Sequence, residues 1–425
     1  MTCALPIRQF GFAPLMMIPL SQHMGVPAVP IVREGEEVAR GQMIAKPGGF
    51  VSVAMHAPAS GIVKKIGWGL NMLGKMVETI YVEPFPGSSQ QIEYGVSHPV
   101  NLDRPDDIVE AVQRAGLVGL GGAAFPTHVK LKIPEGKYAD TILVNGVECE
   151  PYLTTDHRVM LEQKEAIIDG IRLILKATGA KRAIIAIEAN KPDAIRELSA
   201  MVKFTESITI EAVKVKYPQG AEKMLVTTLL GREIPEGGLP IDVHVVVFNV
   251  ASTAEIGWLL PKGYGLTERV ITFAGDGIEK PGNYMIPIGT PLRYALEQAR
   301  WCDNARQIIL GGPMMGQSLA CLDVPITKGT SGVLVFTDDQ VNQSPTKIYP
   351  CIRCGYCVDA CPIHLNPSRL AVLAQNREYE RMANDHHLMD CFECGCCSYV
   401  CPSNIPLVQL FRLSKAVLRE DEGFS

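Results

Sequence analysis

Cysteines near the carboxyl end carry the clearest chemical pattern of this sequence. The chain has 13 cysteines in 425 residues, and nine of them lie between residues 351 and 425. Eight of the nine form two copies of the spacing C-x2-C-x2-C-x3-C-P, which begin at Cys351 and Cys391. Thirteen cysteines are too few for a disulfide scaffold of this length, and thiols clustered at two-residue spacing indicate metal ligation.

The repeated spacing is that of bacterial ferredoxins with two [4Fe–4S] clusters. Three thiolates of one run bind one cluster, and the fourth cysteine binds the other cluster. A pair of zinc sites is the alternative, but zinc requires neither the fourth Cys-Pro nor a duplicated set. The extra cysteine, Cys396, is expected to be a small packed residue. The predicted ligand sets are Cys351, Cys354 and Cys357 with Cys401, and Cys391, Cys394 and Cys397 with Cys361.

A glycine-rich stretch, residues 116–130, is the second candidate site. It matches a degenerate dinucleotide fingerprint at Gly119, Gly121 and Ala124. A true fingerprint follows a strand and opens a helix, whereas here a predicted helix precedes the glycines and Pro126 follows them. We interpret the stretch as a loop whose exposed amides suit a flat ring or a phosphate.

Polar side chains follow the next predicted strand, at residues 141–147. Asn145, Glu148 and Glu150 lie at its carboxyl end, which is where open α/β sheets bind ligands. The alternative is that the two glutamates belong to an ordinary solvated loop. The nearby glycine loop and the predicted electron carriers favour a ligand site.

The elements that position these residues predict a multidomain protein of mixed α/β and α+β class. Short strands and glycine turns over residues 1–98 resemble the barrel-sandwich hybrid of lipoyl domains, but Phe50 stands where the modified lysine would be. Alternating strands and helices over 99–262 predict a largely parallel sheet. Asp156 is expected to cap a helix that buries Ile167, Ile171 and Ile174. Residues 263–340 predict a β-grasp domain of the SLBB-like kind, 338–349 a linker, and 345–425 a two-cluster ferredoxin-type domain.

Composition narrows the class of partner. The formal net charge is −5 and 47% of residues are hydrophobic, which argues against a nucleic-acid-binding protein. No apolar run reaches the 18 or so residues that a membrane-spanning helix needs, and no signal peptide is evident. We therefore expect contact with a membrane only through partner proteins.

Several motifs carry a family resemblance. GLGGAAFPTHVKL, VNGVECEP, YPQGAEKML and FNVAST resemble the flavin and NADH site of the large flavoprotein subunit of respiratory complex I. EPYLTTDHRVM, GDGIEKPGNY, GGPMMG, VPITKGTSG and the cysteine-rich tail more closely resemble the C subunit of the Rnf electron-transport complex. The resemblance implies non-covalent FMN, an NADH site and two [4Fe–4S] clusters.

The same resemblance implies a role and a place. The chain would be the NAD(H)-reactive peripheral subunit of an ion-translocating ferredoxin:NAD+ oxidoreductase, on the cytoplasmic side of the bacterial inner membrane. Its partners would be the membrane subunits and a ferredoxin-like B subunit. Two other functions stay open at this point. One is a soluble reductase such as the cobalamin reductase of bacterial microcompartments, and the other is an electron-wiring subunit without flavin.

The resemblance also assigns roles to single residues. Phe125 and Glu150 would lie beside the nicotinamide, and Lys130 and Asn145 would contact the FMN. Four positions depart from the complex I pattern, namely Leu120, Ile133, Val147 and Ala221. The full set of residues expected to bind the flavin or nucleotide is Gly119, Gly121, Gly122, Lys130, Asn145, Glu148, Tyr217, Gly220, Glu222, Asn249 and Ser252.

Overall fold

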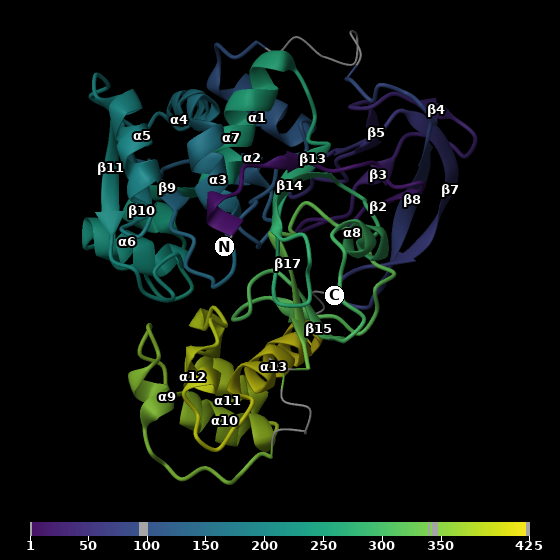
Figure 1. Cartoon of the computed structure of the whole chain (residues 1–425). Helices are drawn as coiled ribbons and strands as arrows, with labels where there is room; N and C mark the ends of the chain where they lie inside the picture. The colour runs from purple at the N-terminus through teal and green to yellow at the C-terminus, as the bar shows by residue number, and fades with distance from the viewer. Residues whose placement is uncertain (1, 93–100, 339–340, 342–346, 422–425) are drawn as a thin grey trace.

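The computed structural model describes residues 2–92, 101–338, 341 and 347–421. The expected boundary at residues 98 and 99 and most of the expected linker lie outside the described residues. Two small β-sheets, an α/β unit, a larger mixed sheet and a helical cysteine-rich unit follow one another along the chain. In Figure 1 the cysteine-rich unit, in yellow, lies below the α/β unit and the mixed sheet.

The N-terminal module is a sandwich of two antiparallel sheets. One has the order β2 (Met16–Pro19), β8 (Met76–Pro84), β7 (Gly61–Leu70), β4 (Glu37–Val38), and the other β3 (Val29–Pro30), β5 (Met43–Lys46), β6 (Met55–His56). Alternate side chains of the longer strands face one core, because successive residues of a strand point to opposite faces. Buried members of this core include Ile18, Ile44, Val63, Ile80 and Val82.

The hairpin that would carry a lipoyl lysine is fixed in place. The Nε2 of Gln113 donates to the backbone carbonyls of Gly49, Phe50 and Ser52 at 3.2, 3.3 and 3.0 Å. The Nε2 of His128 donates to the Phe50 carbonyl at 2.7 Å. These contacts hold the hairpin against the α/β unit, in keeping with a structural module and not a swinging arm.

The α/β unit contains a four-stranded sheet in which every pairing is parallel, as the sequence predicts. Its order is β11 (Ile208–Val213), β10 (Arg182–Glu188), β9 (Thr141–Gly146), β12 (Val245–Asn249). Central strand β10 is apolar on both faces: Ile185 and Ile187 enter one core, and Ile184 and Ala186 enter the other. The helices are α1 (Pro105–Arg114), α2 (Thr127–Leu131), α3 (Thr155–Glu162), α4 (Lys164–Thr178), α5 (Pro192–Val202), α6 (Glu222–Leu230) and α7 (Val250–Leu259), with short 3-10 turns η2 (Pro240–Val243) and η3 (Leu260–Lys262).

The prediction that Asp156 caps the helix with the isoleucine face is wrong. The chain forms two helices, α3 and α4, with a break at Gln163, so that Asp156 lies inside the first turn of α3. The cap comes instead from Glu148, whose carboxylate accepts from the Asp156 amide at 3.0 Å. The predicted face of α4 is confirmed, because its spaced isoleucines are buried.

A six-stranded mixed sheet with one helix follows. Its order is β1 (Arg8–Gln9), β14 (Gly282–Pro287), β13 (Glu268–Ala274), β17 (Gly332–Thr337), β15 (Ala305–Leu310), β16 (Gln317–Ser318), with α8 (Leu292–Gln298). Strand β1, which follows the short turn η1 (Thr2–Ala4), pairs with β14. The first strand of the chain therefore belongs to this sheet, outside the N-terminal sandwich.

The cysteine-rich unit is helical in the residues that the structure describes. It contains α9 (Tyr356–Asp359), α10 (Pro367–Gln375), α11 (Tyr379–Asn384), η4 (Leu388–Asp390), α12 (Cys396–Tyr399) and α13 (Leu407–Asp421). Its core includes Leu370, Leu373, Leu407 and Phe411 from the two longer helices, α10 and α13. Across the described parts of the chain, we find no helix with the length and apolar character that a membrane crossing requires.

Candidate functional site

The glycine loop connects α1 to α2, and its backbone is held by side chains of its own unit and by contacts to the mixed sheet and the N-terminal module. The Ser252 hydroxyl accepts from the Leu120 amide at 2.8 Å and donates to the Val118 carbonyl at 3.2 Å. Arg269, buried on β13, donates to the Leu120 carbonyl at 2.9 Å. Lys328 donates from its Nζ to the carbonyls of Gly116 and Ala54 at 2.7 and 2.8 Å. The loop therefore rests on the mixed sheet and the N-terminal module as well as on its own unit.

One side of this loop is exposed to solvent. Gly121, Gly122 and Ala123 are exposed. Gly122 has a φ of 117°, which side-chain-bearing residues rarely adopt, and a Cβ placed there would meet nothing within 4 Å. A side chain would fill this space, so the glycine keeps it free for a ligand that approaches the backbone.

Lys130 lies on α2, directly after the loop, and Asn145 lies on β9, opposite Asn249 of β12. The Nζ of Lys130 donates to Glu222 at 2.8 Å and to the Val247 carbonyl at 3.1 Å. The amide of Asn145 donates to the Gly220 carbonyl at 2.8 Å. The structure thus joins Lys130 to Glu222 and Asn145 to Gly220, although the two partners lie 92 and 75 residues apart in sequence, respectively.

Asn249 begins the helix that points toward the glycine loop. Its Oδ1 accepts from the amides of Ala251 and Ser252, which caps α7. Its Nδ2 donates to Asp156 at 2.7 Å, and a Cβ on Gly121 would lie 3.2 Å from the same nitrogen. The N-terminus of a ten-residue helix attracts anionic groups such as phosphate. Ser252 is buried and braces the loop from beneath.

Glu148 is occupied within the protein fold. Its carboxylate accepts from the Thr155 hydroxyl at 2.9 Å and from the His157 amide at 3.3 Å, in addition to the Asp156 amide. Burial and the nearby Glu148 charge raise the pKa of Asp156 above its ordinary value. The Glu148 side chain therefore organises the start of α3 under the glycine loop.

Glu150 and Phe125 are the two residues expected beside the nicotinamide. The Glu150 carboxylate accepts from the amides of Met314 and Met315 at 3.0 and 2.7 Å, in the loop after β15. Burial raises the pKa of Glu150, although these two amides oppose the change. The Phe125 carbonyl accepts from the Gly119 amide at 2.8 Å, which closes the glycine loop. The structure thus places Glu150 on the side of the site that faces the mixed sheet and the cysteine-rich unit.

Tyr217 connects the flavin-like motifs to the second cysteine run. Its hydroxyl donates to the Cys394 carbonyl at 2.6 Å. Burial raises the pKa of Tyr217, with Glu150 as the next cause, so the hydroxyl stays protonated at neutral pH. Close by, Lys223 of α6 forms an ion pair with Asp390 at 2.7 Å. The run that begins at Cys391 therefore contacts the α/β unit directly.

Electrostatic interactions link thiols within each of the two groups. The thiol of Cys357 interacts electrostatically with Cys354, Cys401 and Cys351, and that of Cys397 with Cys391, Cys394 and Cys361. A cavity with almost entirely apolar walls is lined by the second group. Four cysteines around an apolar cavity fit a [4Fe–4S] cluster, which four cysteine thiolates hold.

The two groups differ in exposure. Cys351 and Cys354 are exposed, whereas Cys394 and Cys397 are buried. We call the group of Cys391, Cys394, Cys397 and Cys361 the inner set, and the group of Cys351, Cys354, Cys357 and Cys401 the outer set. Cys396 is half-buried beside the inner set. Burial raises the pKa of Cys149, whose sulfur accepts from the Gly220 amide, to about 11.

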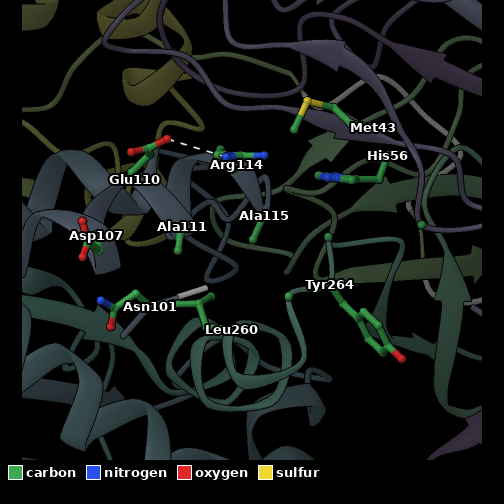
Figure 2. Close-up of a pocket in the computed structure, with 13 residues that line it drawn as sticks. Met43, His56, Asn101, Asp107, Glu110, Ala111, Arg114, Ala115, Leu260 and Tyr264 are labelled. Atoms are coloured by element: carbon green, nitrogen blue, oxygen red, sulfur yellow. Dashed lines mark ion pairs between the residues drawn. The ribbon is translucent and has the colours of Figure 1, made fainter. Parts of the chain in front are cut away.

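A separate cavity of about 270 Å³ lies between the N-terminal module and α1 (Figure 2). Its wall includes His56, Tyr264 and the ion pair of Arg114 with Glu110 at 3.7 Å. None of the residues predicted to bind FMN, NAD(H) or iron lines it. The candidate cofactor sites therefore lie elsewhere, at the glycine loop and the cysteine sets.

Sequence reasoning missed three contributors to these sites. They are the buried cations Arg269 and Lys328, which hold the glycine loop, and the Met314–Met315 amides, which bind Glu150. Lys328 belongs to VPITKGTSG and the two methionines belong to GGPMMG, motifs that contribute to the resemblance without indicating a role, whereas Arg269 lies outside the quoted motifs. Burial lowers the pKa of Lys328 to about 7, a cost that its two carbonyl contacts offset in part.

The fold and site define an iron–sulfur flavoprotein of electron transport. Residues 112–258 match the Nuo51 FMN-binding domain, residues 350–405 a 4Fe-4S dicluster domain, and residues 1–85 the RnfC barrel sandwich hybrid domain. The first two matches imply FMN and two [4Fe–4S] clusters.

Curated relatives give the family. The chain is 40% identical over 402 residues to the C subunit of the proton-translocating ferredoxin:NAD(+) oxidoreductase complex of Clostridium ljungdahlii, covering 92% of this chain and 85% of that protein. It is 40% identical over 391 residues to the C subunit of the Na(+)-translocating complex of Acetobacterium woodii, covering 91% and 87%. The chain belongs to this family, RnfC, whose members are the C subunits of ion-translocating ferredoxin:NAD+ oxidoreductases, which confirms the predicted family and function.

A solved NAD+-reducing [NiFe]-hydrogenase in its H2-reduced state shares the fold. The TM-score is 0.53 with 18% identity, over 76% of this chain and 67% of the hydrogenase chain. At this identity the likeness concerns the fold alone.

Proposed function

We propose that this chain is the subunit at which NAD(H) exchanges electrons with the complex, through FMN at the glycine loop and then through the inner and outer clusters. The proposal assigns the flavin to the open loop at Gly121 and Gly122, beside Lys130 and Asn145. Bound FMN supplies the exchange between a two-electron hydride and single electrons. The order of the clusters follows from which cysteine set contacts the flavin-binding unit.

In this scheme the chain's own residues position and shield. Lys130 supplies a positive charge next to the loop, and the α7 N-terminus with its cap Asn249 supplies amides for the phosphate. Ser252 and Arg269 keep the loop backbone in shape from beneath. Glu150 borders the nicotinamide side. No general base is needed, because the hydrogen leaves the nicotinamide as a hydride and no proton has to be removed from it.

One observation carries the proposed order of electron transfer. The hydroxyl of Tyr217, in the flavin-like motif, donates at 2.6 Å to the carbonyl of a predicted inner-set ligand, Cys394. The Lys223–Asp390 ion pair supports the same contact between the α/β unit and the second cysteine run, which we call the junction. The inner cluster would therefore lie between the flavin and the outer cluster.

The outer set includes two exposed cysteines, Cys351 and Cys354, and has exposed apolar neighbours. Ile352, Tyr356 and Tyr399, each close in sequence to an outer-set cysteine, are 67, 58 and 81% exposed. Exposed aromatic and aliphatic side chains around a redox centre favour docking of a protein partner. We assign this face to another subunit of the complex, either a membrane subunit or the ferredoxin-like B subunit, at the cytoplasmic side of the bacterial inner membrane.

Anaerobic reconstitution with FMN, iron and sulfide tests the proposal. NADH added to the purified chain should bleach the flavin absorbance. A chain that retains FMN and yet shows no bleaching with NADH, alone or within the complex, contradicts an NAD(H) site. A chain that binds about eight iron atoms but no FMN would be an electron conduit only.

A further inference from the structure

The cysteine repeat provides an internal comparison. A shift of 40 residues relates Cys351 to Cys391, and the same shift relates the start of α10 at Pro367 to the start of α13 at Leu407. Equivalent positions in the two halves can therefore be compared one by one. Their differences in charge include Glu393, Arg412 and Lys415 in the inner half, which correspond to Arg353, Val372 and Gln375 in the outer half.

Lys415 is the most unusual of these residues. It lies on α13 and its side chain is only 7% exposed. Its Nζ donates to the carbonyl of Cys391, a predicted inner-set ligand, and lies 3.2 Å from Glu393. Gln375, at the equivalent position of the outer half, is exposed. A buried ammonium thus touches the inner ligand loop, and its counterpart position carries no charge.

The neighbouring charges leave an excess of one positive charge at this place. Glu393 is shared between Lys415 and Arg412, whose Nε lies 3.0 Å from it. Arg412 also donates to the Met315 carbonyl at 3.3 Å. Two further acids lie in this region: Asp390 pairs with Lys223, and Glu236 pairs with His387. In the outer half the single cation of this group, Arg353, is exposed to solvent and ions.

Such a charge acts on the reduction potential of a cluster. Reduction adds one negative charge, and a cation held in a buried place stabilises that charge more than one that water and salt screen. Net charge, hydrogen bonds and solvent exposure are the protein's means of setting cluster potentials.

We propose that Lys415 is a potential-setting residue of the inner cluster, whose charge holds the midpoint potential of that cluster above the value that the buried site would otherwise give. The proposal rests on the proposed function in one respect, the assignment of Cys391, Cys394, Cys397 and Cys361 to one cluster. Lys415 acts through the ligand loop and through space, so it is a positioning and electrostatic residue and not a cluster ligand.

Potentiometric titration of the reconstituted chain, followed by electron paramagnetic resonance, tests this proposal. Lys415→Met should lower the equilibrium constant for reduction of the inner cluster about tenfold, which is 59 mV for a one-electron couple. Lys415→Arg should keep the wild-type potential. Gln375→Met, the matched change in the outer half, should shift neither cluster.

A second variant guards against loss of the cluster in Lys415→Met. Glu393→Gln removes the compensating carboxylate and should shift the inner potential in the opposite, positive direction. An unchanged inner potential in Lys415→Met, or in Glu393→Gln when the first variant loses iron, overturns the proposal. Absence of a second cluster signal in the wild-type chain would instead count against the proposed function, so the two failures are distinguishable.

Discussion

The two halves of the cysteine-rich unit have the same ligand spacing and different surroundings. The inner half is contacted by Tyr217 and Lys223 of the α/β unit, and Gly395 lies against the Met314 carbonyl of the loop after β15. In the outer half, Cys351 and Cys354 are exposed, as is Tyr356. In the proposed function, one copy of this duplicated motif faces the flavin and the other faces a partner protein.

This difference indicates that residues outside the ligand motif determine the place of a cluster in the electron pathway. Both runs offer four thiolates with identical spacing, so either could bind the cluster nearer the flavin. In the proposed order the two runs are distinguished by contacts of Tyr217 and Lys223, 177 and 167 residues from their partners, which dock the second run against the α/β unit. Four experiments test this difference between the two halves.

Removal of one cysteine from each half should give the largest difference. Cys394→Ser should leave about four of eight iron atoms and should abolish reduction of the outer cluster by NADH, because the connection to the flavin is lost. Cys354→Ser should lose as much iron and still allow NADH to reduce the inner cluster. Freeze-quench paramagnetic resonance measures both, and equal behaviour of the two variants would contradict the assigned order.

A change at the flavin site should affect neither half. Lys130→Ala removes the charged donor beside the glycine loop and should weaken FMN binding about tenfold to hundredfold, the usual effect of losing a charge-assisted hydrogen bond. Iron content should stay at the wild-type value. Lys132→Ala, an exposed neighbour, is the control in a fluorescence titration with FMN, and a parallel loss of iron and FMN would refute the separation of the sites.

Loss of the Tyr217 hydroxyl should have a moderate effect on the inner half alone. Tyr217→Phe keeps the ring and removes the donor to the Cys394 carbonyl. One net hydrogen bond corresponds to about 1 kcal/mol, so iron release from the inner cluster to a chelator should accelerate about fivefold. Tyr356→Phe, beside the outer set, is the matched change and should leave that rate unaltered.

The smallest expected effect is a pH dependence of one contact in the junction, that of His387 in the cysteine-rich unit with Glu236 of the α/β unit. The Glu236 carboxylate raises the pKa of His387 above 6.5 by hydrogen bonding and charge. The stabilising contact is therefore fully present below pH 6.5 and is lost as the pH rises through the raised pKa. Both side chains are more than half exposed, so the effect is small.

Hydrogen exchange of residues 386–391 measures this dependence. Protection should be greater at pH 6 than at pH 8 in the wild type, and His387→Gln should remove the difference. His386→Gln serves as the adjacent control. A dependence that survives in His387→Gln would show that another group controls the junction.

Much of the fold was predictable because its causes are local in sequence. The cysteine runs, the parallel strands around Ile185 and the glycine loop each follow from spacing or composition within about ten residues. Helix breaks were less so: a periodic apolar face marks α4, yet the carboxylate that starts α3 comes from Glu148. The capping role passes to a residue from the preceding strand end, which no helical pattern reveals.

The contacts between units could not be predicted. Arg269 and Glu150 each reach a partner about 150 residues away, at Leu120 and at Met314. Backbone groups are the partners in both cases, and a backbone carbonyl or amide leaves no trace in the sequence. The sequence therefore indicates which residues belong to the site, whereas their arrangement between units depends on the folded chain.

The structure of the chain with FMN and both clusters bound tests the central claim most directly. The quantity to measure is the distance from the flavin ring to the nearest iron atom of each cluster. We predict that the cluster bound by Cys391, Cys394, Cys397 and Cys361 lies nearer the flavin, with the other cluster beyond it. A flavin bound nearer to the cluster of Cys351, Cys354, Cys357 and Cys401 would contradict it.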